Sequence, residues 1–188
     1  MIDPQPVLRQ APLEILCTLG WVQATLHLPA HQGLDEALAL SGPSLKLTNV
    51  RIPRDPEPHG FLALRRDSIS LVVPVMGAHI VNGAAYGPTR RREVACLLSD
   101  SMLRGVVDIP GGLRLSDFLR LDSPFLVVRQ GLLAPYGGTL QSAEARMLDL
   151  ALVNRDHIVG VSEPAEINEA PGAVPARPRR ASPAIPTV

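Results

Sequence analysis

Histidine and cysteine are the side chains of this chain that could hold a metal ion or act as nucleophiles. His27 and His31 lie on either side of Pro29 at the end of an expected strand, where they could meet a third metal ligand. The chain has no helical histidine pair and no C-x-x-C partner of the kind that zinc requires, so we interpret them as solvated loop histidines. Cys17 and Cys96 each lie in an apolar run, not in a C-x-x-C pair or at a helix start that would stabilise a thiolate. We therefore expect reduced core cysteines, no metal site, no cofactor and no catalytic residue, and the sequence favours a protein that is not an enzyme.

Two Arg-Asp pairs, at Arg66 and at Arg155, lie between apolar runs and indicate tight turns. An arginine in such a turn could hold a phosphate or stack on an RNA base. Against this, an aspartate follows each arginine and the formal net charge of the chain is zero, whereas phosphate binding depends on excess positive charge. We interpret both pairs as structural turns, and Arg66 and Arg155 remain RNA contacts in an alternative hypothesis.

An internal repeat organises these residues. Residues 22–29 align with residues 103–110 at an offset of 81, and residues 66–69 align with 155–158 at an offset of 89. The second copy therefore contains an insertion of eight residues. We expect Gly137, Gly138 and residues 140–146 to hold this insertion as a loop. Coinciding apolar and proline positions indicate one fold present twice.

Each copy contains the same pattern of elements. The first two strands, 13–19 with 22–28 and 94–98 with 103–109, should form hairpins that turn at Gly20 and at Ser99-Asp100 and end at Pro29 and Pro110. A short helix follows, with its apolar stripe at 34–38 or 115–119 and with Ser116-Asp117 as the N-cap of the second. The later strands are expected at residues 44–52, 61–65 and 68–73, and at 125–128, 148–153 and 157–161.

This pattern predicts a mostly β fold made of two tandem five-stranded barrels, SH3-like or Sm-like, each with one short helix after its second strand. A split barrel or a half-open sandwich is the alternative. The first barrel spans residues 13–74, a linker spans 75–92, and the second barrel spans 93–163. Residues 164–188 are rich in proline and alanine and are expected to be a disordered tail.

Residues 68–89 carry no charged side chain and precede three arginines, a length and charge pattern that would permit a membrane span. Pro74, His79 and Asn82 interrupt the stretch, so we expect no transmembrane span, although contact with a membrane-bound complex remains open. The first twelve residues lack the apolar run of a secretory signal, and the expected location is cytoplasmic.

The second copy resembles an uncharacterised bacterial family of small β domains with the pattern G-x-L-x-L-P, then R-L-S-D-x-L-N, then F-I-x-L. The resemblance rests on residues 103–110, on Arg114 to Leu119, and on Phe125 and Leu126, with Arg120 where the pattern has asparagine. The first copy keeps Leu28-Pro29 and the helix. This resemblance implies two tandem copies of the domain and identifies no catalytic residue or ligand.

Taken together, these observations favour a non-enzymatic adaptor or assembly subunit that binds other proteins as a peripheral part of a larger complex. The chain has no net charge, and only 3% of its residues are aromatic. Both features argue against a surface that binds nucleic acid. The expected partner contacts are apolar residues of the inserted loop: Leu132, Leu133, Pro135 and Tyr136. The alternative is an Sm-like RNA-binding protein acting as a fused pseudo-dimer through Arg66 and Arg155.

Overall fold

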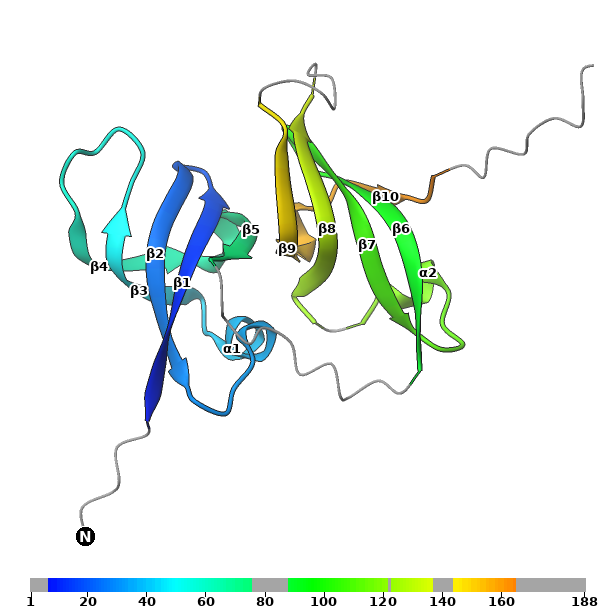
Figure 1. Cartoon of the computed structure of the whole chain (residues 1–188), viewed down its shortest axis with the longest axis horizontal. Coiled ribbons are helices and arrows are strands. Elements are labelled where there is room, and N and C mark those ends of the chain that lie inside the picture. The colour runs from blue at the N-terminus through cyan, green and yellow to red at the C-terminus, as the bar shows by residue number, and fades with distance from the viewer. Residues whose placement is uncertain (1–6, 76–87, 122, 137–143, 165–188) are drawn as a thin grey trace, which may run out of the picture.

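The computed structural model describes residues 7–75, 88–121, 123–136 and 144–164, and its strands form one antiparallel sheet (Figure 1). The first half of the chain contains β1 (Leu8–Cys17), β2 (Gly20–Pro29), α1 (Leu34–Leu40), β3 (Ser44–Arg51), β4 (His59–Arg65), the 3-10 turn η1 (Arg66–Ser68) and β5 (Ile69–Pro74). The second half contains β6 (Thr89–Leu97), β7 (Ser101–Pro110), α2 (Leu115–Phe118), β8 (Phe125–Pro135), β9 (Arg146–Asn154), the 3-10 turn η3 (Arg155–His157) and β10 (Gly160–Ser162).

The strand order is the same in both halves. It is β5-β1-β2-β3-β4 in the first half and β10-β6-β7-β8-β9 in the second. Even a local irregularity recurs, because the pairing of β2 with β3 and of β7 with β8 shifts register at the same place. Beside each shift lies a residue with φ of +50°, Asn49 in the first half and Gln130 in the second. These two residues are 81 positions apart, the offset of the sequence repeat.

Local sequence signals place the hairpins as expected. β1 pairs with β2 from Cys17 and Gly20 outward, and Gly20 has a φ of +94°, a conformation that glycine adopts without strain. Pro29 and Pro110 are the last residues of β2 and β7. The helix N-cap prediction is wrong, because α2 begins at Leu115 with Arg114 as its N-cap, which places Ser116 inside the helix.

The prediction of two closed barrels is wrong. Closing a five-stranded barrel would require β4 to pair with β5 of the same half, and β9 with β10. Instead β5 pairs with β9, through Leu71 opposite Val153 and Val72 opposite Leu152. Because β5 uses its outer edge for this contact, the two halves share one open ten-stranded sheet. We call the contact between β5 and β9 the junction.

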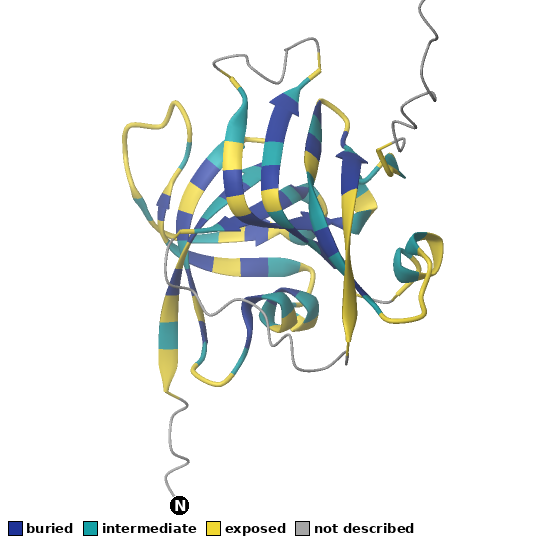
Figure 2. Cartoon of the chain, turned by 45° about the vertical axis from the view of Figure 1, so that its right-hand side comes forward, coloured by how far each residue is buried: buried dark blue, intermediate teal, exposed yellow. Residues whose placement is uncertain are grey.

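Two apolar cores lie on opposite faces of the junction strands. In β9, Leu150 and Leu152 belong to the core of the first half, whereas Ala151 and Val153 belong to the core of the second half. Successive side chains of a strand point to opposite faces, so each half completes the core of the other. Figure 2 shows the alternation of buried and exposed residues along the strands. The need to bury both faces explains why β9 ends in an uninterrupted apolar run.

The extra residues of the second copy lengthen a hairpin. β8 has 11 residues against 8 in β3, and β9 has 9 against 7 in β4. The loop expected around Gly137, Gly138 and residues 140–146 is therefore partly strand, while residues 137–143 lie outside the described part of the chain. Most of the expected linker and nearly all of the expected tail also lie outside it. Neither helix in the described ranges has the length and hydropathy needed to cross a membrane.

Candidate functional site

Arg66 and Arg155 occupy equivalent places and bind equivalent structures. Arg66 donates from Nη1 to the carbonyl oxygen of Ser41, at the end of α1, over 3.3 Å. Arg155 donates from Nη1 to the carbonyl oxygens of Phe118 and Leu119, at the end of α2, over 3.0 and 2.7 Å. Cations commonly bind the last carbonyls of a helix in this way. Each arginine therefore ties a 3-10 turn to the helix of its own half, a structural role.

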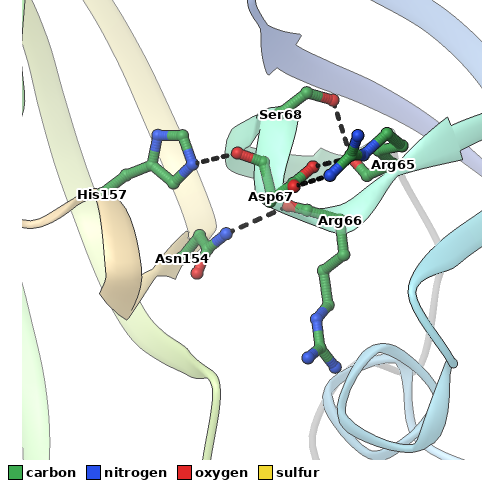
Figure 3. Close-up of polar contacts among 6 residues, drawn as sticks. All are labelled: Arg65, Arg66, Asp67, Ser68, Asn154 and His157. Atoms are coloured by element: carbon green, nitrogen blue, oxygen red, sulfur yellow. Dashed lines mark hydrogen bonds and ion pairs between the residues drawn. The ribbon is translucent and has the colours of Figure 1, made fainter.

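The two 3-10 turns meet at the junction, where Asn154 and His157 of the second half reach the first half (Figure 3). Asn154 donates from Nδ2 to the carbonyl oxygens of Ile69 and Arg66 over 2.9 and 3.2 Å. His157 Nε2 lies 2.7 Å from the carbonyl oxygen of Asp67, which can only accept, so Nε2 is the donor. These polar contacts fix how the halves join.

Sequence reasoning missed Asn154 and His157, although the repeat contained a signal. At the offset of 89 their counterparts are Arg65 and Ser68. Arg65 is exposed and pairs with Asp67 of its own turn. Asparagine and histidine therefore replace arginine and serine at the turn whose side chains donate hydrogen bonds across the junction, and such departures from the repeat could have marked the contact.

A second polar contact closes the opposite end of the junction. Arg146 of β9 forms an ion pair with Glu14 of β1. The same guanidinium lies over the ring of Trp21, 4.4 Å from its centroid. Trp21 and Glu14 belong to the outer face of the first half, which Arg146 therefore covers in part.

The four expected partner contacts do not form an inserted loop, contrary to the prediction. Leu132, Leu133 and Pro135 belong to β8, and Tyr136 follows its last residue. Leu133 is 6% exposed and packs in the core of the second half, so it is unsuited to bind a partner. Tyr136 is 52% exposed and Leu132 is half-buried. Whether these residues bind a partner stays a prediction.

Leu132 belongs to an apolar area on the outer face of the second half. It lies opposite Met147 of β9, which is 73% exposed, and opposite Arg104 of β7. Directly opposite residues share a face of the sheet, and Met102 joins them two residues before Arg104. Met102, Arg104 and Leu132 line an open groove of about 600 Å³. We call Met102, Arg104, Leu132 and Met147 the outer patch.

Most of the outer patch has no apolar counterpart in the first half. At the offset of 81, Arg104 corresponds to Gln23 and Leu132 to Arg51, and Met102 corresponds to Trp21, which Arg146 covers. The start of β4 aligns with Leu148 of β9 at the offset of 89. Met147 comes just before Leu148, so it lies in the part of the hairpin that is longer in the second half. Leu132 thus has a polar counterpart in the first half, and the apolar counterpart of Met102, Trp21, packs against the core of the second half.

The groups expected to do chemistry are placed as follows. Burial raises the pKa of the Cys17 thiol and raises that of Cys96 to about 11. Both cysteines are free thiols in the cores, as expected. His27 makes a 2.8 Å hydrogen bond with the Thr48 hydroxyl. Within the described ranges, no three histidine, cysteine, aspartate or glutamate side chains converge on one point.

Comparison of the chain with protein families, with curated proteins and with solved structures found no match. The resemblance to a bacterial family of small β domains therefore stays a prediction. The geometry of the outer patch and of the junction is the basis for the proposals that follow.

Proposed function

We propose that the chain is a non-enzymatic adaptor or assembly subunit that binds a protein partner through the outer patch. The observation that carries this proposal is the exposure of Met147 beside Leu132 on two paired strands. Apolar side chains clustered on a rigid surface are typical of protein-binding sites, and methionine is enriched there. At Leu132, β8 is paired with β7 on one side and with β9 on the other, so the patch is held in place before a partner arrives.

The composition of the groove suggests what kind of partner fits. Glu93 and Arg104 border the apolar centre of the groove, so charges of both signs surround it. A mixed rim around an apolar centre resembles the usual anatomy of protein interfaces. A polyanion such as RNA needs a surface dominated by arginine and lysine instead. We therefore favour a protein surface that presents apolar side chains framed by polar ones.

The test replaces one apolar residue at a time by lysine. Met147→Lys and Leu132→Lys place a charge in the patch, and Leu40→Lys is the matched control because Leu40 is 70% exposed on α1, outside the patch. A partner recovered by affinity capture from the native cell is purified, and its dissociation constant is measured for each variant. We expect each patch variant to weaken binding about tenfold or more, as loss of an interface centre does.

The control should bind as tightly as the unmodified chain. Equal dissociation constants for all three variants would contradict the proposal, provided that circular dichroism shows them folded. Loss of binding for Leu40→Lys alone would move the site to α1.

A further inference from the structure

The two ends of the sheet are the same two kinds of edge that pair at the junction. The junction joins the fourth strand of the second half, β9, to the fifth strand of the first half, β5. Because both halves have the same strand order, the outermost strands are β4, a fourth strand, and β10, a fifth strand. We propose that copies of this chain associate head to tail, with β4 of one copy pairing with β10 of the next.

The junction also defines the expected register of this contact. At the junction Leu71 lies opposite Val153 and Val72 lies opposite Leu152. Moved by the repeat offset of 89, these pairs become Gly160 opposite Leu64 and Val161 opposite Ala63. The unpaired backbone groups of both edge strands would then be hydrogen-bonded, as an exposed strand edge favours.

The exposure of Phe61 is the first observation that favours pairing of the β4 edge with another copy. Its counterpart at the offset of 89 is Leu150, which is 8% exposed because it packs in the core of the other half. Phe61 is 61% exposed, although it is an aromatic residue of a strand. Burying a phenylalanine side chain is worth roughly 1.5–3 kcal/mol. A second copy placed as at the junction would cover it.

The second observation is the burial of helix α2, which lies on the β10 side of the proposed contact. In the first half, helix α1 buries Leu34 and Leu38 completely, and it contacts β8 of the second half. Helix α2 holds the equivalent stripe, but Leu115 and Phe118 are only partly buried. In the described part of the chain, α2 makes no contact with the first half comparable to the contact of α1 with β8. The apolar stripe of α2 is thus less buried than that of α1, and a neighbouring copy placed as at the junction would cover it.

Sequence differences make this contact weaker than the junction. At the offset of 81, Ser44 and Lys46 correspond to Phe125 and Val127, which pack against the core of the first half. Arg65 replaces Asn154, so the buried amide contact is absent. We therefore expect reversible association that depends on concentration. A heterologous contact of this kind builds a ring if its rotation closes, and a linear filament if it does not.

This inference does not depend on the outer patch, and its test uses the purified chain alone. Light scattering measures the mass of the 20.1 kDa chain across a dilution series. Phe61→Glu blocks the β4 edge because the expected register brings Phe61 opposite Glu163 of the next copy. Val159→Lys blocks the β10 edge because the same register brings Val159 beside Arg65 of the next copy. Leu40→Lys is the control, since Leu40 is about as exposed as Val159 but lies on α1, away from both sheet edges and from the outer patch.

We expect the unmodified chain and the control to form multimers, and each edge variant to lose at least about tenfold in association constant. A mixture of the two edge variants should form a dimer of one copy of each and nothing larger. The intact β10 edge of one variant can pair with the intact β4 edge of the other, and both remaining edges are blocked. Circular dichroism confirms that each variant is folded. A monomer at every concentration up to the solubility limit would overturn the proposal, as would loss of association in only one edge variant.

Discussion

The side-chain amide of Asn154, the last residue of β9, donates a 2.9 Å hydrogen bond to the carbonyl oxygen of Ile69, the first residue of β5. Asn154 is 1% exposed, and its Oδ1 accepts a hydrogen bond from the backbone N–H of Asp156 over 3.2 Å. One buried amide thus binds the backbone of β5 in the first half and also orders the 3-10 turn η3 in the second half. The residue at the equivalent place in the first half is Arg65, which faces solvent.

Asn154→Ala should lower the free energy of unfolding by about 1–3 kcal/mol, because it removes two hydrogen bonds across the junction, one of them buried. The matched control is Arg65→Ala, whose exposed ion pair with Asp67 should contribute less than about 1 kcal/mol. Urea unfolding followed by circular dichroism measures both. Equal effects of the two substitutions would show that the junction does not depend on this amide.

Gly105→Ala should destabilise the second half by roughly 1–3 kcal/mol through overpacking. An added Cβ at Gly105 would lie 2.5 Å from Cγ1 of Val128 and 2.8 Å from the carbonyl oxygen of Arg129. Gly60→Ala is the control, since nothing lies within 4 Å of its Cβ position, and it should be neutral or stabilising. Thermal unfolding compares the two variants, and a Gly105→Ala variant as stable as the unmodified chain would contradict the packing argument.

The thiol of Cys96 should be almost unreactive in the folded chain. Burial raises its pKa to about 11, against the smaller opposing effect of Arg155. At about pH 8 only about one molecule in a thousand would carry the reactive thiolate. A chromogenic disulfide reagent should therefore react slowly with the native chain. Once the chain is unfolded, both cysteine thiols should react with it. Rapid native labelling, read separately in Cys17→Ser and Cys96→Ser variants, would show that a core opens.

Asp35→Asn should stabilise the chain at neutral pH. Burial raises the pKa of Asp35, and Oδ1 of its carboxyl group is buried with no hydrogen-bond partner among the residues that the structure describes. A folded-state pKa above the unfolded value means that this group stabilises the fold when protonated, below the unfolded pKa. That stability is lost as the pH rises through the folded pKa.

Urea unfolding of the Asp35→Asn variant at about pH 7 and about pH 3.5 measures the change. The gain over the unmodified chain should appear at the higher pH and shrink at the lower one. Glu36→Gln is the control, because Glu36 is an exposed neighbour in the same helical turn. A gain of equal size at both pH values would show that ionisation of Asp35 is not its cause.

Several local features could be predicted from the sequence because they depend on neighbouring residues. Alternating apolar residues predicted β2 and β7, and proline ended both strands because it cannot donate to the sheet. The offsets of 81 and 89 predicted equivalent elements in the two halves, and the repeated strand order agrees with them. The position of Leu133 was mispredicted, since a lengthened strand and an inserted loop add the same number of residues.

By itself, the sequence determined the mostly β composition, the hairpins, the helix that follows the second strand of each half and the turns at Arg66 and Arg155. Only the tertiary structure decided that β5 pairs with β9, that Asn154 and His157 hold this contact, and that Leu132 and Met147 share an exposed face. Hairpins and turns depend on residues close in the chain, whereas the choice of partner for a free strand edge depends on distant segments. Closing each half on itself or joining the two would satisfy the same backbone groups, and the pattern of one strand does not distinguish them.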